Sequence, residues 1–124
     1  MPLGYDIVTE APQVRVVGSG TVSMSAMIAI IGRVAADPRF HSHFTVTFDL
    51  RAATYTAELA DGDALAAVLS QKNADFQNRF AVVVPESLHF LVRLYCALTA
   101  LGGFDKIQCF ASMDEAQEWC RMQR

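Results

Sequence analysis

The sequence contains no cluster of basic residues, and this absence argues against one large class of function. Its ten lysines and arginines are scattered along 124 residues, and the formal net charge is −3. Nucleic-acid binding depends on concentrated positive charge that displaces counterions from the phosphates. We therefore expect no nucleic-acid partner for this chain.

The sequence also lacks an apolar run long enough to cross a membrane. Its longest apolar stretch, residues 88–104, is interrupted by His89 and Arg93, whereas a spanning helix needs about 20 apolar residues. The first ten residues have neither the basic start nor the apolar centre of a signal peptide. We therefore expect a cytoplasmic protein without a membrane span.

Cysteines are few, and their spacing does not suggest a metal or redox motif. Cys96, Cys109 and Cys120 form no CxxC pair, and their number is odd. This pattern favours reduced, buried thiols, with one disulfide and a free third thiol as the lesser alternative.

Charged residues are scarce at 19%, while hydrophobic residues reach 52%, more than in an average globular domain. A chain of this length can bury a substantial core. We expect one domain over residues 1–124, with part of the apolar surplus at an interface.

Hydrophobic periodicity predicts an α/β fold with the element order β-β-α-β-α-β-α-β-α. Ser23 and Ser112 are expected N-caps, and Asp61 or Asp63 is expected to open the second helix. Strand and helix alternation after a first hairpin indicates a mixed, mostly parallel five-stranded sheet. The predicted strands cover residues 5–10, 13–20, 44–50, 79–85 and 106–110, and the predicted helices cover 24–36, 61–73, 86–101 and 113–123.

The predicted strands alternate between apolar and polar residues, which bears on how the sheet is covered. A parallel sheet with helices on both faces has strands that are apolar throughout. Here we expect one wetter face and helices stacked on the other side only. In residues 44–51 the apolar set is Phe44, Val46, Phe48 and Leu50, and the polar set is Thr45, Thr47, Asp49 and Arg51.

The third predicted helix, residues 86–101, has apolar residues on two faces, whereas a surface helix normally has one. Three explanations of the second apolar face remain open: self-association, binding of an apolar ligand, or deep burial between neighbouring helices. The first stripe is Leu88, Leu91, Val92, Tyr95 and Leu98, and the second is Phe90, Leu94, Leu98 and Leu101.

Two short motifs, "FDLR" at Phe48–Arg51 and "DEAQEW" at Asp114–Trp119, together with the element order, give a resemblance to a known family. The chain resembles the SpoIIAA-like group of small bacterial proteins, related to the STAS domain of anti-sigma-factor antagonists. This resemblance implies a β–α superhelix with helices on one side of a mixed sheet. It also implies a binding module and not an enzyme.

The regulatory members of that family have a phosphorylatable serine at the start of the helix after the third strand. Phosphorylation there switches partner binding by adding charge. In this chain the matching positions are Asp61, Gly62 and Asp63, and Thr56 is the nearest hydroxyl residue. Asp61 and Asp63 stand either as fixed negative charges or, more simply, as acids favoured at a helix N-terminus.

Candidate chemical sites have simpler interpretations. His41 and His43 share one face of an extended segment, but a zinc site needs three or four ligands. The remaining histidine, His89, belongs to a helix, so the pair is best interpreted as surface or turn residues. Ser87 begins a helix but lacks a G-x-S-x-G elbow. We expect no catalytic residue, no cofactor and no metal.

The leading hypothesis is a non-enzymatic, STAS-like module that binds a protein partner or forms a homodimer. The alternative is a carrier or sensor of a small, lipid-like apolar ligand. Asp49 and Arg51 are included because ligands bind near the carboxyl ends of strands in open α/β sheets. The candidate partner or ligand surface comprises Phe90, Leu94, Leu98, Leu101, Asp49, Arg51, Asp61 and Asp63.

Overall fold

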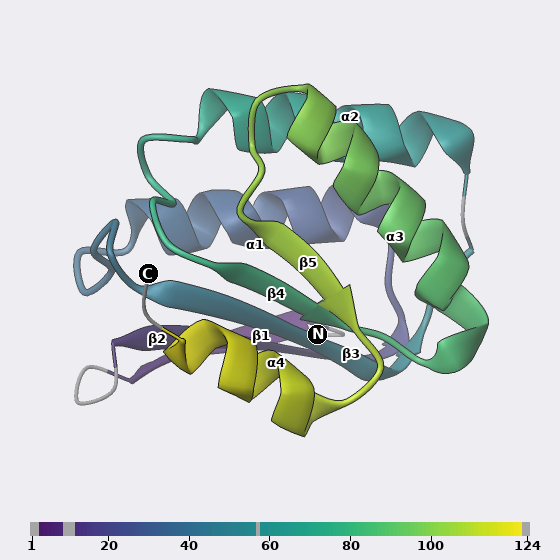
Figure 1. Cartoon of the computed structure of the whole chain (residues 1–124), viewed down its shortest axis with the longest axis horizontal. Coiled ribbons are helices and arrows are strands. Elements are labelled where there is room, and N and C mark those ends of the chain that lie inside the picture. The colour runs from purple at the N-terminus through teal and green to yellow at the C-terminus, as the bar shows by residue number, and fades with distance from the viewer. Residues whose placement is uncertain (1–2, 9–11, 57, 123–124) are drawn as a thin grey trace.

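The computed structural model of the chain describes residues 3–8, 12–56 and 58–122. Five strands form one sheet in the order β1-β2-β3-β4-β5, and four helices cover it (Figure 1). The elements are β1 (Leu3–Val8), β2 (Gln13–Thr21), α1 (Met24–Ala36), β3 (Thr45–Thr54), α2 (Leu59–Gln71), β4 (Phe80–Val83), α3 (Glu86–Leu101), β5 (Ile107–Phe110) and α4 (Met113–Arg121).

The sheet is mixed and mostly parallel, which confirms the predicted fold class and element order. Strands β1 and β2 pair antiparallel, and every later pair is parallel. Thr9 and Glu10, the end of the first predicted strand, lie outside the described residues. Between Val17 and Ser19 the pairing of β2 with β3 shifts register, an irregularity of the β-bulge type.

Local sequence signals set most of the helix ends. The Ser23 hydroxyl accepts a hydrogen bond from the Ala26 amide at 3.1 Å and caps α1. Ser112 caps α4 in the same way through the Glu115 amide. After α3, Gly103 adopts a positive φ of 111°, a conformation that favours glycine and stops the helix.

Helices α1, α2 and α3 lie on one side of the sheet, above the main core (Figure 1). Each connects two neighbouring parallel strands, and the right-handed crossover rule places such successive helices on the same face. Phe80 lies at the centre of this core. Its ring stacks on Phe48 at 5.3 Å and meets Phe76 and Phe104 edge-on at 5.7 and 6.0 Å.

Helix α4 lies on the opposite face, so the expectation of helices on one side only is wrong for this helix (Figure 1). Within the described residues no strand follows α4, so the crossover rule sets no side for this helix. Ala116 and Cys120 of α4 pack against Ala81 and Val83 of β4. Gln123, also predicted for the inner stripe of α4, lies outside the described residues.

This packing also changes the character of the sheet face that was predicted to be wet. Thr45 and Thr47 of β3 are buried, and only Asp49 and Arg51 farther along the strand remain partly or fully exposed. Arg79 extends across the same face, where its guanidinium lies 4.9 Å from the centre of the Trp119 ring. It also donates to the Trp119 carbonyl oxygen at 2.7 Å. The polar residues of β3 therefore lie on a sheet face that α4 buries at Thr45 and Thr47 and leaves open to solvent at Asp49 and Arg51.

Helix α2 begins at Leu59, two residues before Asp61 and four before Asp63, which corrects the predicted start. Glu58 occupies the N-cap position. Gly62, between the two aspartates, lies buried inside the helix. A methyl group on Gly62 would lie 2.9 Å from Tyr95 Cδ1 and 3.0 Å from Leu98 Cδ1. Gly62 is therefore required for the close approach of α2 to α3.

Among the described residues there is no helix with both the length and the apolar composition needed to span a membrane.

Candidate functional site

One face of α3 exposes large apolar side chains to solvent. Phe90 is 83% exposed, Leu94 38% and Leu101 85%, and Ala97 between them is also exposed. The spacing of four, three and four residues places all of them along one side of the helix, as in the seam of a helix pair. We call these four residues the α3 outer face. Deep burial between helices is therefore wrong for this stripe.

The opposite side of α3 packs into the protein. Tyr95 and Thr99 are buried, and Leu88, Val92 and Cys96 are half-buried against the main core. Leu98, which belongs to both predicted stripes, is half-buried and lies against Gly62. Of the four predicted residues of the second stripe, three are therefore at the surface and one is at the junction with α2.

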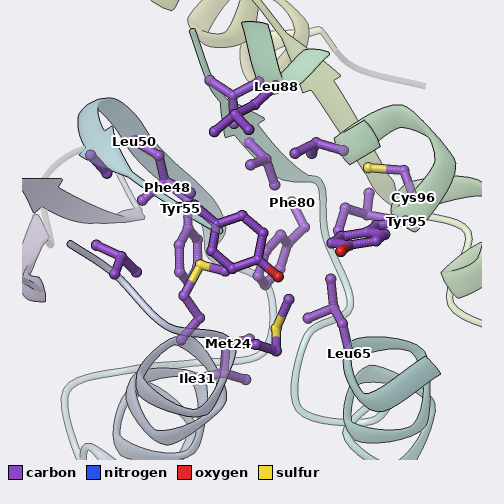
Figure 2. Close-up of a pocket in the computed structure, with 17 residues that line it drawn as sticks. Met24, Ile31, Phe48, Leu50, Tyr55, Leu65, Phe80, Leu88, Tyr95 and Cys96 are labelled. Atoms are coloured by element: carbon purple, nitrogen blue, oxygen red, sulfur yellow. The ribbon is translucent and has the colours of Figure 1, made fainter. Parts of the chain in front are cut away.

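Behind α3 lies an apolar cavity of about 50 Å³. We call it the inner cavity. Its walls present only apolar surface, and Figure 2 shows α1 contributing Met24 and Ile31, α2 Leu65, and α3 Leu88 and Cys96. Such a space stays free of water because water finds no polar partner in it. Its full lining is Val22, Met24, Met27, Ile31, Phe48, Leu50, Ala53, Tyr55, Leu65, Phe80, Val82, Val84, Leu88, Val92, Tyr95, Cys96 and Ile107.

Two tyrosine rings line the inner cavity while their hydroxyls bind elsewhere. Tyr95 donates to the Glu58 carbonyl oxygen at 2.6 Å, and Tyr55 donates to the Asp61 carboxylate. Burial and this hydrogen bond raise the pKa of Tyr55. These two bonds tie the start of α2 to the residue after β3 and to α3, so the cavity wall on this side is held in place.

Asp61 and Asp63 therefore have different environments. Asp61 lies half-buried in the first turn of α2, where it accepts the Tyr55 hydroxyl. Asp63 is exposed on the same helix. The position of Asp61 agrees with the simpler prediction, an acid favoured by the helix N-terminus, with an added structural contact to Tyr55.

Asp49 and Arg51 form an ion pair along one strand, on the sheet face that α4 partly covers. Arg51 Nη2 lies 2.9 Å from Asp49 Oδ2, and Arg51 Nε lies 2.9 Å from Asp49 Oδ1. This bond with Arg51 holds the pKa of Asp49 below its usual value. The two charges of the pair neutralise each other. The sheet separates the pair from the α3 outer face. The structure therefore does not combine these candidates into one site.

The remaining candidates, His41, His43 and Ser87, do not form one site. His41 and His43 are exposed in the turn before β3, with ring centres 6.0 Å apart. Ser87 is exposed in the first turn of α3. No group of three His, Cys, Asp or Glu side chains within the described ranges is arranged to hold a metal ion.

Sequence reasoning missed the inner cavity, although the sequence contains a signal for it. That signal is the pair Met24 and Met27 of α1, whose side chains line the cavity. Methionine is flexible and often fills irregular gaps in a core. The composition predicts that part of the apolar surplus lies at an interface, and part of it also surrounds this cavity. A cavity depends on which side chains meet across three helices and a sheet, and this information is not local.

No protein-family model matches the chain, and no protein among those with curated descriptions matches it either. A solved structure does. It is described as an uncharacterised protein from the DUF3478 family with a SpoIIAA-like fold, from Shewanella loihica PV-4. The similarity covers 95% of this chain and 91% of that chain, with a TM-score of 0.59 and 11% sequence identity. At this identity the likeness shows the fold alone, and the predicted SpoIIAA-like fold is confirmed.

Proposed function

We propose that this chain is a non-enzymatic, cytoplasmic interaction module whose α3 outer face pairs with a second copy of the chain. The observation behind the proposal is the exposure of Phe90 and Leu101, at 83% and 85%. Exposed aromatic and aliphatic side chains that share one face of a protein mark interaction surfaces.

The composition of α3 supports this proposal. The helix has 16 residues, of which Glu86 and Arg93 are the only acidic or basic ones apart from His89. A helix normally carries charged or polar residues on the face that is exposed to solvent. A two-fold axis across Leu94 and Ala97 would bring two identical seams together, each covering the other. The 4-3-4 spacing suits such a helix pair.

Size-exclusion chromatography with light scattering tests this proposal. We expect the wild-type chain to elute at twice the chain mass at high micromolar concentration, and Leu94→Asp to elute as a monomer. Met122→Asp is the matched control, because Met122 is 51% exposed at the end of α4, on the other side of the sheet. A wild-type monomer that Leu94→Asp leaves unchanged would contradict the homodimer.

A second candidate function, a carrier or sensor of a small apolar ligand, is favoured by the inner cavity. Its walls are wholly apolar, and it lies between α1, α3 and the sheet. Apolar pockets of this kind are the usual places for small-molecule binding. Native mass spectrometry of freshly purified protein tests it, and we expect a co-purified mass that mild organic extraction removes. Consistent absence of such a mass, together with no binding of added alkyl probes, would contradict it.

A further inference from the structure

A second, polar pocket opens on the surface between α3 and β5. It has a volume of about 320 Å³ and is lined by His89, Arg93, Cys96, Ile107, Gln108 and Cys109. We call it the outer pocket. Two of these residues, Cys96 and Ile107, also line the inner cavity. The two spaces therefore adjoin at these two residues, which we call the partition.

Arg93 brings one positive charge to the outer pocket. Arg93 is exposed, and the ion pairs within the described residues are Asp37–Arg39, Asp49–Arg51 and Glu118–Arg121, which leaves Arg93 without a carboxylate partner there. Its charge acts inside the pocket. Burial raises the pKa of the Cys109 thiol to about 11, and the Arg93 guanidinium opposes that rise. The pocket therefore favours negative charge.

The two spaces together match the two ends of an amphiphile. Arginine recognises carboxylates through paired, charge-assisted hydrogen bonds. The inner cavity offers room for about four water-sized groups, at roughly 10–15 Å³ for each, and so for a chain of about four methylenes beyond the partition.

We infer that the protein binds an alkyl carboxylate, with its carboxylate on Arg93 in the outer pocket and its chain passing between Cys96 and Ile107 into the inner cavity. This inference rests on the second proposed function, ligand binding in the cavity, and is independent of pairing through the α3 outer face. It adds the ligand's charge, its orientation and its point of entry. Lengthening the chain by one methylene strengthens binding by about fourfold until the cavity is full.

The test compares octanoate with 1-octanol by isothermal titration calorimetry on the whole chain. The two probes share their alkyl chain and differ in head-group charge. Arg93→Gln removes the proposed head-group contact, and Arg15→Gln is its control, an exposed arginine on β2. Ala53→Val fills the inner cavity from β3. Ala52→Val is its control, because Ala52 is exposed on the same strand.

We expect octanoate to bind the wild-type chain at least about tenfold more tightly than 1-octanol, as for a hydrogen bond to a charged group. Arg93→Gln abolishes that preference and Arg15→Gln keeps it. Ala53→Val weakens both probes, whereas Ala52→Val weakens neither. Chemical shifts of backbone amides in α1 and α2 confirm that each variant is folded.

The other outcomes separate failure of the inference from failure of the proposed function. Equal affinities for the two probes, both reduced by Ala53→Val, would overturn the head-group assignment and leave apolar ligand binding in place. Octanoate binding that Ala53→Val does not affect would place the chain outside the cavity and overturn the inference. Absence of binding for both probes would overturn the inference and the ligand-binding function together.

Discussion

Thr47 of β3 and Cys120 of α4 meet across a dry interface, with Thr47 Oγ1 3.8 Å from Cys120 Sγ. Thr47 is completely buried, although it belongs to the strand face predicted to be wet. The contact shows that α4 closes the second face of the sheet over β3 and β4. A threonine suits this position because its hydroxyl has a partner and its methyl group packs.

The docking of α4 can be tested at Ala116, which is fully buried against β4. Ala116→Asp places an unpaired carboxylate in that interface, and we expect a loss of about 3 kcal/mol or more of unfolding free energy. The same change at exposed Ala67 of α2 should cost less than about 1 kcal/mol. Urea unfolding measures both, and equal effects would contradict the burial of α4.

Two helical glycines should respond in opposite directions to alanine. In a helix interior, alanine is favoured over glycine by about 1 kcal/mol. A methyl group on Gly32 of α1 meets no atom within 4 Å, whereas one on Gly62 meets Tyr95 Cδ1 at 2.9 Å. We therefore expect Gly32→Ala to raise the melting temperature and Gly62→Ala to lower it. A rise in both variants would contradict the close approach of α2 and α3.

Asp37 should make the stability depend on pH below neutrality. Hydrogen bonds from Arg39 and from the Tyr5 hydroxyl hold the pKa of Asp37 well below its usual value. A lowered pKa stabilises the fold above the unfolded-state pKa of about 3.9, and that stabilisation is lost as the pH falls through the folded-state pKa.

The difference in urea midpoint between wild type and Asp37→Asn should therefore be larger at pH 7 than at pH 3. Asp75→Asn, a change at an exposed aspartate in the turn after α2, should show little difference at either pH. A midpoint difference for Asp37→Asn that does not change with pH would contradict this role.

The thiols should be unreactive in the folded protein. Cys96, Cys109 and Cys120 are free, and burial raises the pKa of Cys96 to about 12 and that of Cys109 to about 11. Burial also raises the pKa of Cys120. Because the thiolate is the reactive form, we expect slow labelling by a disulfide reagent at pH 8 and fast labelling in urea.

These raised pKa values also have a thermodynamic consequence with a definite sign. The stabilisation from neutral buried thiols is complete below the unfolded-state pKa of about 8.5, and it is lost as the pH rises through the folded-state values. Unfolding free energy should therefore fall from pH 8 to pH 11, and by less in Cys96→Ala. Equal slopes for wild type and variant would contradict the burial of Cys96.

Features that depend on neighbouring residues could be predicted. Ser23 caps α1 and the Gly102-Gly103 pair ends α3, because capping and left-handed conformations involve only a few adjacent residues. The predicted start of α2 was wrong because it rested on local N-cap preference at Asp61 or Asp63, whereas the helix begins at Leu59. The role of Gly62 inside that helix is set by Tyr95 and Leu98, which are distant in the sequence.

The candidate site likewise has features that could be predicted from the sequence and features that could not. Two apolar stripes on residues 86–101 are visible in the sequence because helical periodicity is local. Which stripe would be exposed could not be predicted, since the first stripe is also apolar. The structure places Tyr95 inside and Phe90 outside. The inner cavity could not be predicted at all, because its lining comes from β3, β4, β5 and all three helices on that face.

The sequence by itself determined the order of strands and helices, most of their ends, and the mostly parallel sheet. Hydrophobic period, capping residues and crossover handedness act through neighbouring residues or through a general chain constraint. Tertiary structure alone decided that α4 covers the second face, that Gly62 lies inside α2, and that a dry cavity and a polar pocket adjoin at Cys96. Each of these depends on two surfaces meeting, and the free energy of that contact belongs to neither segment alone.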